Sequence, residues 1–226
     1  MEILRAEHLV KSYNETYGTI YALNDVSFSV ESGEIIAVIG SSGSGKSTLF
    51  HILGSVDSPT SGTVYMNDQN VFEQSPEELA VFRRREVGII YQFNNLLPLL
   101  TVRENILLPA LLDGRTPNEE DYRELVDMLG LTGREDAFPE ELSGGQQQRV
   151  AIGRTLINKP AVVLSDEPTG NLDMRNTQQI MNLFKYCNRR YNQTIMMITH
   201  DENIALQADR ILTLEDGRLI SDKRNR

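Results

Sequence analysis

An eight-residue segment at 40–47, Gly-Ser-Ser-Gly-Ser-Gly-Lys-Ser, matches the phosphate-binding pattern G-x-x-x-x-G-K-[ST] at every fixed position. The glycines allow consecutive backbone N–H groups to converge on phosphate oxygens, and the helix beginning near Lys46 adds its N-terminal dipole. We expect Lys46 to reach the β- and γ-phosphates and the Ser47 hydroxyl to ligate Mg²⁺. An apolar run at 35–39 precedes this phosphate loop (P-loop, residues 40–47), and a helical pattern follows it. The sequence therefore predicts a nucleoside triphosphate site.

Two adjacent acids, Asp166 and Glu167, follow a second apolar run at 162–164. The carboxyl end of a parallel strand lies in the crevice where such sheets bind ligands. Asp166 can hold Mg²⁺ there, and Glu167 can accept a proton from an attacking water. Strands often end in acids, so the pattern has meaning only together with the P-loop. The pair predicts hydrolysis of the bound triphosphate.

A third segment, Leu-Ser-Gly-Gly-Gln at 142–146, opens a helix that continues through Leu156. Ser143 is a natural N-cap, but two glycines directly after it each cost roughly 1 kcal/mol relative to alanine. They make sense where a phosphate must approach a bare helix N-terminus. Because the P-loop already supplies one such cradle, two anion sites in one chain suggest that two chains share each nucleotide.

Composition narrows the classes of protein to which the chain can belong. The chain has 226 residues, enough for a sizeable core, and a net charge of −10, which disfavours nucleic acid as a partner. Its one cysteine, Cys187, excludes an internal disulfide, and its apolar surroundings at helical spacing predict a buried side chain. There is no signal-peptide pattern and no apolar run long enough to span a bilayer. These features favour a cytoplasmic protein.

The elements that must position these motifs are predicted from hydrophobic patterns. Strands are expected at 26–30, 35–39, 161–164, 194–198 and 210–214, and helices at 46–53 and 174–191. Between about 75 and 158 the chain is mostly helical. Ser75, Thr101 and Thr116 each stand three residues before Glu and are expected to cap helices, and Gly130 is expected to end one. The pattern indicates one α/β core with a helical insertion in its middle.

The order of the P-loop, the 142–146 segment, the two acids and His200 resembles that of ATP-binding cassette (ABC) transporter ATPase subunits. The resemblance covers essentially the whole chain. It implies an α/β P-loop NTPase fold of the ABC ATPase type, with an N-terminal antiparallel β subdomain and a helical insertion carrying the 142–146 signature. It also implies a single domain over 1–226, with the α/β core at 1–91 and 159–226 and the helical subdomain at approximately 92–158.

The resemblance also implies roles for individual residues. ATP is expected to contact Tyr13, Gly40, Ser41, Ser42, Gly43, Ser44, Gly45, Lys46, Ser47 and Thr48. A second chain is expected to contact the same ATP through Ser143, Gly144, Gly145, Gln146 and Asp173. The catalytic residues are expected to be Glu167, His200, Gln92 and Lys46. Mg²⁺ is expected to bind to Ser47, Gln92 and Asp166. Tyr13 takes the place of an aromatic that stacks on adenine, although Tyr17 and Tyr21 compete with it.

Segments at 57–62, 90–98 and 166–173 are similar to the macrolide-exporter and lipoprotein-release (MacB/LolD-like) branch. This implies a homodimer on an integral membrane permease at the cytoplasmic face of a bacterial-type membrane, without direct contact with the transported substrate. A cell-division ATPase of the same branch, whose permease regulates wall hydrolysis, remains an alternative. Non-transport ABC ATPases carry coiled-coil or zinc insertions that are absent here. Gly153 and Ser165 stand where the family usually has alanine, away from the catalytic positions.

The segment at 93–100, Phe-Asn-Asn-Leu-Leu-Pro-Leu-Leu, is apolar but has neither helical nor strand periodicity. One interpretation is a surface that receives the permease, since it follows Gln92 directly. The other is that its leucines pack the core of the helical insertion.

Overall fold

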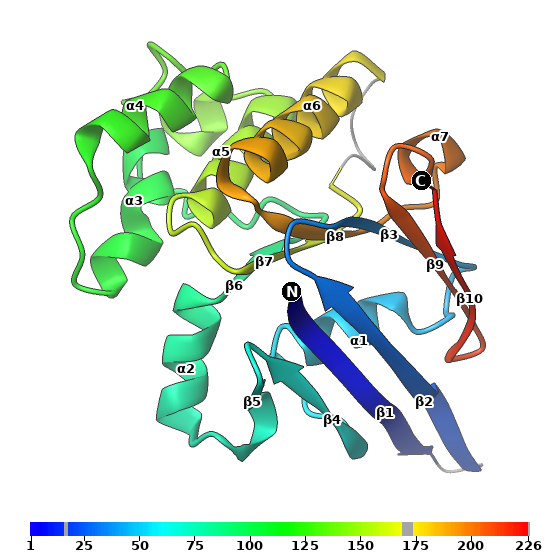
Figure 1. Ribbon diagram of the computed structural model, residues 1–226. Helices are drawn as coiled ribbons and strands as arrows, with labels where there is room; N and C mark the ends of the chain where they lie inside the picture. The colour runs from blue at the N-terminus through cyan, green and yellow to red at the C-terminus, as the bar shows by residue number, and fades with distance from the viewer. Residues whose placement is uncertain (16–17, 169–173, 226) are drawn as a thin grey trace.

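The computed structural model describes residues 1–15, 18–168 and 174–225, and two sheets form its framework (Figure 1). The larger sheet has the order β10-β9-β3-β8-β7-β6 and is parallel except for β10. Its strands are β3 (Ile35–Ile39), β6 (Val87–Ile90), β7 (Val162–Asp166), β8 (Thr194–Ile198), β9 (Arg210–Glu215) and β10 (Arg218–Arg224). The smaller sheet is antiparallel with the order β2-β1-β4-β5. Its strands are β1 (Glu2–Glu15), β2 (Gly18–Glu31), β4 (Ser61–Met66) and β5 (Gln69–Asn70).

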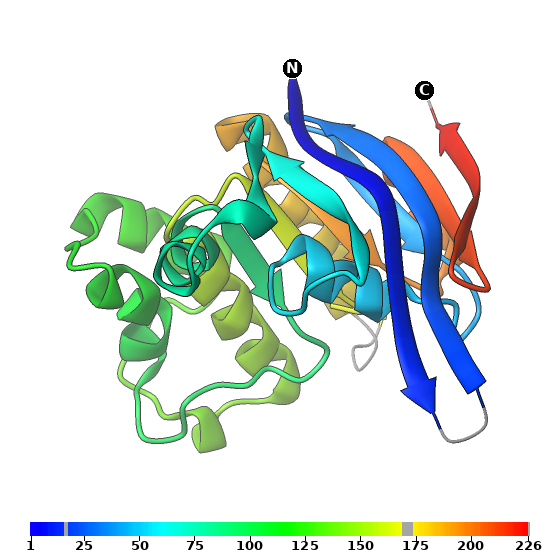
Figure 2. The same ribbon diagram turned by 90° about the horizontal axis from the view of Figure 1, so that it is seen from below.

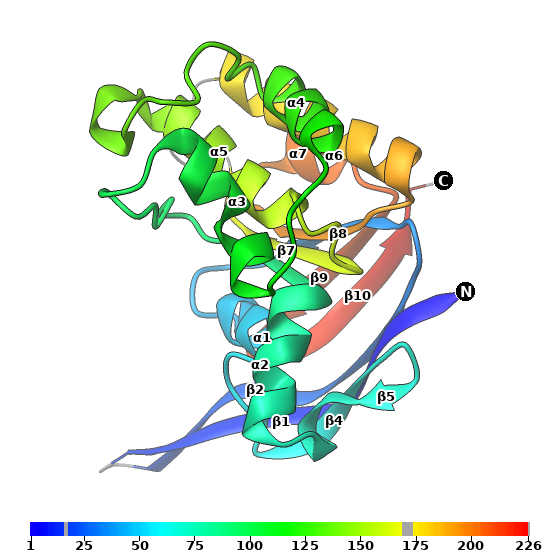
Figure 3. The same ribbon diagram turned by 90° about the vertical axis from the view of Figure 1, so that its left-hand side faces the viewer.

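Helices cover both faces of the larger sheet. They are α1 (Lys46–Leu53), α2 (Pro76–Arg85), α3 (Val102–Leu112), α4 (Glu119–Met128), α5 (Gly144–Leu156), α6 (Met174–Tyr191) and α7 (Glu202–Ala205), with short 3₁₀ turns at Val71–Glu73 and Pro139–Glu141. Helices α3 to α6 gather on one side, whereas α1 lies on the other side, between the two sheets (Figures 1 and 3). Within the described ranges, no helix combines the length and apolar character needed to cross a membrane.

Two hydrophobic cores flank the larger sheet because its strands are buried on both faces. Along β3, Ile35 and Ala37 belong to the core shared with α3 to α6, and Ile36 and Val38 to the core shared with α1 and the smaller sheet. Cys187 is buried in the first core, as expected, and burial raises the pKa of its thiol to about 12. The helical insertion is thus packed directly onto the sheet that carries the P-loop.

Several expected elements are confirmed, and one expected cap is wrong. Helix α1 has the expected bounds, and Ser75 and Thr101 form capping boxes at the starts of α2 and α3. Gly130 follows α4 with a positive φ of 61°. The cap of α4, however, is Asn118, whose side-chain oxygen accepts a hydrogen bond from the backbone N–H of Glu120 at 2.8 Å. Asn is as strong an N-cap as Ser and stronger than Thr, so it takes the position expected of Thr116.

The expected strand at 26–30 proves to be the end of a much longer hairpin. β1 and β2 each have 14 residues and form a ribbon whose far end projects beyond the rest of the fold (Figure 2). Four shifts in their pairing register interrupt the ladder. Because a register shift breaks the alternation of apolar and polar residues, the hydrophobic pattern did not reveal the full strands.

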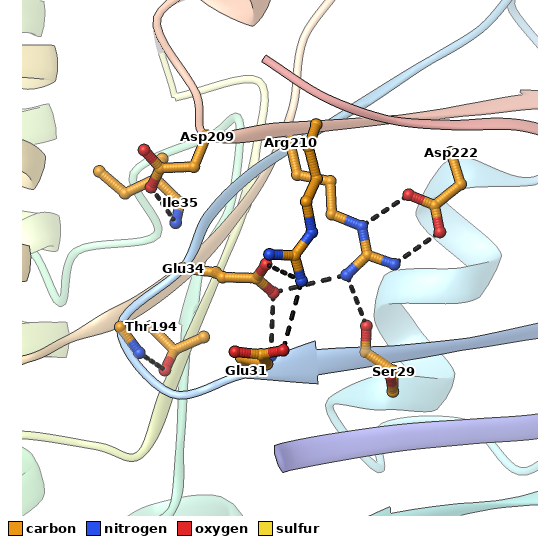
Figure 4. A network of polar contacts seen from close by, with 10 residues as sticks. Ser29, Glu31, Glu34, Ile35, Thr194, Asp209, Arg210 and Asp222 are labelled. Atoms are coloured by element: carbon orange, nitrogen blue, oxygen red, sulfur yellow. Dashed lines mark hydrogen bonds and ion pairs between the residues drawn. The ribbon is translucent and has the colours of Figure 1, made fainter. Parts of the chain in front are cut away.

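Arg210, a buried cation on β9, fixes the C-terminal hairpin against the end of β2 (Figure 4). Its guanidinium donates two hydrogen bonds to Asp222 of β10, at 2.6 and 2.5 Å, and a third to the carbonyl oxygen of Ser29 at 2.8 Å. Glu34 lies 3.4 Å from the same guanidinium. The hydrogen bonds to Asp222 raise the pKa of Arg210 and lower that of Asp222. One side chain therefore joins the two sheets.

Replacing Arg210 with Met is expected to lower the free energy of unfolding by about 2–3 kcal/mol, since it leaves Asp222 and the Ser29 carbonyl without their donor. Arg224→Met is the matched control, because Arg224 pairs with Glu31 and Glu34 from an exposed position and is worth less than about 1 kcal/mol. Urea unfolding measures both. Equal losses in the two variants would contradict the role given to Arg210.

The same substitution changes the dependence of stability on pH. Arg210 holds the folded-state pKa of Asp222 below its ordinary value, so this contribution is present at neutral pH and is lost as the pH falls through the folded-state pKa. Arg210→Met is therefore expected to cost less stability at pH 3 than at pH 7.

Candidate nucleotide site

The P-loop joins β3 to α1, and its glycines are required by close backbone approaches. Gly40 and Gly45 have φ values of 153° and 99°. A Cβ on Gly40 would lie 2.2 Å from the carbonyl oxygen of Leu214, and one on Gly45 equally close to that of Ala22. The Lys46 ammonium donates hydrogen bonds to the carbonyl oxygens of Gly40 and Ser41, at 3.0 and 2.7 Å. The loop thus holds a cation at its centre, where phosphate oxygens would bind.

A cavity of about 400 Å³ opens over this loop. It is lined by Ala22, Gly40, Ser42, Gly43, Gly45, Lys46, Ser47, Thr48, Glu167, Ile198 and His200. The structure therefore brings most of the predicted P-loop residues together with Glu167 and His200. Ala22 and Ile198 line the cavity without having been predicted, because a small or apolar residue on a strand gives no sequence signal of binding.

The other two residues of the P-loop, Ser41 and Ser44, do not line the cavity. Ser44 is buried and takes a hydrogen bond from Lys46 at 3.3 Å, so it supports the loop from within. Ser41 is exposed and contributes its carbonyl oxygen to Lys46.

Asp166 lies at the end of β7, close to the Ser47 hydroxyl at the start of α1. Burial raises the pKa of Asp166, and the interaction with Ser47 partly offsets the effect. In the described part of the chain, no group of three or more His, Cys, Asp or Glu side chains is placed to bind a metal. Mg²⁺ in triphosphate sites takes only one or two protein oxygens, because phosphates and waters complete its shell. The donor set of Ser47 and Asp166 fits that chemistry.

Glu167 and His200 lie at the ends of adjacent strands, β7 and β8. Oε1 of Glu167 is 3.4 Å from Nδ1 of His200, with the carboxylate about one-quarter exposed. Glu167 adopts a left-handed backbone with φ of 46°, and its N–H donates to the carbonyl oxygen of Ile198 at 3.2 Å. A non-glycine residue held in this conformation costs of order 1–3 kcal/mol and is often found at functional sites.

Glu167 also lines a second cavity, of about 410 Å³, on its other side. This cavity is lined by Gln92, Phe93, Asn94, Asn95, Leu96, Pro139, Gly144, Gln147, Gln148, Glu167 and Pro168. Gln92 thus shares a cavity with Glu167 but does not line the P-loop cavity. Glu167 is therefore common to the nucleotide cavity and the cavity beside the loop that carries Gln92.

The signature segment forms the start of α5. Ser143 is its N-cap, and it exchanges hydrogen bonds with Gln146 in a capping box, at 3.3 and 2.9 Å. Ser143 and Gly144 are exposed, and none of residues 143–146, all of which are described, lines the P-loop cavity. A Cβ on Gly144 would meet nothing within 4 Å. Contacts within this chain therefore give no reason for a glycine at that position.

Tyr13 is exposed and does not line the P-loop cavity. Its ring lies 5.3 Å from the Lys11 ammonium, and its hydroxyl donates to Asp57 at 3.4 Å. It pairs with Ile20 across the β1–β2 ribbon, and Tyr21 is exposed as well. The adenine contact thus stays a prediction. Tyr17 and Asp173 lie outside the described residues.

The 93–100 segment divides between the two interpretations given to it. Leu96 packs against the core of the helical insertion. Phe93, Leu97 and Leu99 are exposed, Leu99 to 88%. The buried side chain of Asn105 on α3 fixes the backbone of this segment. Its oxygen accepts a hydrogen bond from the N–H of Leu97 at 2.9 Å, and its amide donates to the carbonyl oxygens of Leu97 and Leu100 at 3.1 and 2.9 Å. The exposed side chains therefore stand on a backbone held in place.

Comparisons with known proteins agree with this geometry. The family model described as ABC transporter matches residues 23–170. The chain is similar to the lipoprotein-releasing system ATP-binding proteins LolD of Cytophaga hutchinsonii and Bordetella pertussis. It is 44% and 43% identical to them over 97% of its length and 99% and 96% of theirs.

Among solved structures, it is similar to the dimeric ATP-binding cassette MJ0796 in a post-hydrolysis state bound to ADP and Pi, with a TM-score of 0.91 and 36% identity over 99% of both chains. It is also similar to cbiO1 from Clostridium perfringens, part of the ABC transporter complex cbiONQ. There the TM-score is 0.86 and the identity 28%, over 99% of this chain and 89% of the other. With the P-loop, the paired acids and the signature helix in place, the chain belongs to the ABC transporter family, as an ATP-binding and ATP-hydrolysing subunit.

Proposed function

We propose that two copies of this chain bind ATP between them and use its hydrolysis to drive a membrane permease at the cytoplasmic face of the membrane. The observation that carries the proposal is the meeting of Lys46, Glu167 and His200 around one cavity. Lys46 and the backbone of the P-loop would hold the phosphates, and Glu167 would accept the proton of the attacking water. His200 would contact the γ-phosphate.

Ser47, Asp166 and Gln92 would hold Mg²⁺, which neutralises phosphate charge when bound. The Ser47 hydroxyl and the Asp166 carboxylate already lie close together. Gln92 lines a cavity with Glu167 but not the P-loop cavity, so we propose that its loop moves toward the P-loop to bring Gln92 to the ion. Hydrolysis would then depend on the position of the loop that begins at Gln92.

The homodimer is supported by the exposed start of α5. Glycines at 144 and 145 weaken the helix, and Gly144 has open space in front of it. A phosphate bound by the partner chain would use that space and the helix dipole. Asp173 is proposed to join this shared site. The dimeric state of the similar cassette MJ0796 is consistent with the arrangement.

The permease is proposed to dock on Phe93, Leu97 and Leu99, which are exposed although apolar. The similarity to LolD proteins favours a permease of the lipoprotein-releasing type. The ATPase subunit would act on it by transmitted movement, without touching the transported substrate. We also propose that residues 92–158 form the helical subdomain that moves with the permease.

Glu167→Gln is expected to keep ATP binding while lowering the hydrolysis rate by a factor on the order of 10²–10⁴, since the amide cannot accept the proton. Glu202→Gln is the control, because Glu202 is an exposed carboxylate on α7 that does not line the cavity. Phosphate release and binding of a fluorescent ATP analogue measure the two quantities. Near-normal turnover of Glu167→Gln would refute the assignment.

Saturating ATP is expected to convert the Glu167→Gln protein from monomer to dimer, because hydrolysis no longer separates the chains. Adding Ser143→Arg should abolish the dimer while sparing ATP binding, as the P-loop of each chain is untouched. Glu120→Arg, on the exposed start of α4, is the control for introducing an arginine at a helix start, and its change of charge is larger than that of Ser143→Arg. Light scattering distinguishes the species, and a Ser143→Arg protein that still dimerises would count against the shared site.

Leu99→Glu is expected to leave thermal stability and ATP binding unchanged but to abolish co-purification with the permease. Leu206→Glu, a similarly exposed leucine on α7 at the other end of the sheet, should retain the permease (Figure 1). Leu96→Glu should lower the melting temperature, because Leu96 packs on the core. Retention of the permease by Leu99→Glu would place the docking surface elsewhere.

A further inference from the structure

Helix α5 holds the backbone on both sides of Gln92. Before it, the Thr155 hydroxyl shares its one hydrogen between the carbonyl oxygen of Ile89, at 3.3 Å, and that of Ala151 in its own helix, at 3.0 Å. After it, the Arg154 guanidinium donates to the carbonyl oxygens of Asn94 and Asn95, at 3.0 and 2.8 Å. Two neighbouring residues of one helix therefore determine where the Gln92 loop begins and where it continues.

Arg154 makes these bonds although its charged guanidinium is partly removed from water. Burial lowers the pKa of its guanidinium, and no carboxylate forms an ion pair with it among the residues that the structure describes. Its charge is stabilised by carbonyl dipoles, and one of them belongs to Asn95, whose φ of 46° is left-handed. A partly buried cation without an ionic partner contributes little to stability by itself. Its planar donors can instead fix two successive carbonyl groups in one orientation.

The bonds join two parts of the proposed machinery. Helix α5 has 13 residues, so about 20 Å separate its ends. Ser143 to Gln146 lie at its N-terminus, where the partner's nucleotide is proposed to bind. Arg154 lies in its last turn, against the loop that carries Gln92. Asn94 adds a third link by donating from its amide to Gln147 of the same helix at 3.4 Å.

We propose that Arg154 is a positioning residue that places Gln92 for hydrolysis and ties its loop to the signature helix. This inference rests on the proposed function, since it requires Gln92 to act in hydrolysis. A displacement of the loop by the permease would then move the start of α5 with it, and the nucleotide held by the partner chain would sense the same displacement.

A double-mutant cycle between Arg154→Lys and Gln92→Ala tests the proposal, in the complex of the ATPase with its permease. Lys keeps the charge but cannot bind two carbonyl groups in a fixed orientation. Arg154→Lys alone is expected to lower kcat roughly tenfold to a hundredfold with little change in KM for ATP, because the P-loop is untouched. In the Gln92→Ala background it should have almost no further effect.

Arg149→Lys is the matched control. Arg149 lies on the same helix but donates to the carbonyl oxygens of Gly145 and Leu129, at 3.2 and 3.4 Å, away from the loop. Its effect on kcat should be the same with and without Gln92. If the effect of Arg154→Lys is likewise independent of Gln92, the residue is structural and the proposal is overturned.

Thr155→Val provides a second route if Arg154→Lys unfolds. It removes the hydroxyl that holds Ile89 while keeping the side-chain shape, and it should also lose its effect in the Gln92→Ala background. An additive result would overturn the proposal. Glu167→Gln, measured in parallel, separates a failure of the proposed function from a failure of the role given to Arg154. If Glu167→Gln stays active, the proposed catalytic site is wrong. If it is inactive while the cycles are additive, only the role of Arg154 is wrong.

Discussion

Four neighbouring parallel strands ending at one edge are the constraint on which the site depends. β3, β8, β7 and β6 lie side by side, and each delivers one chemical group at its carboxyl end. β3 leads into the P-loop, β8 into His200, β7 into Asp166 and Glu167, and β6 toward Gln92. Residues separated by up to 160 positions meet only because the strands run the same way. The two flanking cores keep that sheet buried on both faces.

Glu167 occupies the point where this edge divides into two cavities. Its left-handed backbone and its hydrogen bond to Ile198 turn the chain sharply after Asp166. The two adjacent acids therefore have different surroundings: Asp166 is partly buried near Ser47, and Glu167 lines both cavities. A regular strand would point them to opposite faces of the sheet, so the turn is what keeps both near the P-loop.

Elements whose boundaries are set by neighbouring residues were predicted correctly from the sequence. The P-loop, the bounds of α1 and the N-cap of α5 depend on neighbouring residues, and the pattern was sufficient for each. The long hairpin was not predicted, because its irregular register hides the alternation on which strand prediction depends. The cap of α4 was misplaced because Asn118 competes with Thr116 over a distance of two residues.

Tertiary contacts decide the burial and the partners of side chains that local sequence patterns could not assign. The leucines at 96 and 99 are chemically identical, and only packing against the insertion core makes one buried and the other exposed. Arg154 likewise reads as an ordinary cation near a helix C-terminus until the fold brings it to the carbonyl groups of Asn94 and Asn95. Such residues are recognised from what they touch, which no local pattern records.

Gly153 illustrates why the signature helix can transmit a movement. A Cβ at this position would lie 2.7 Å from Leu129 and 3.2 Å from Ile106, so the glycine allows α5 to pack closely against α3 and the end of α4. Glycine in a helix interior costs roughly 1 kcal/mol relative to alanine, and the close contact offsets that cost. Interiors packed in this way shift as units and do not deform continuously. A force applied at the exposed side chains of the 93–100 segment would therefore be passed to α5 and α3, because the segment is fixed to α5 by Arg154 and to α3 by Asn105.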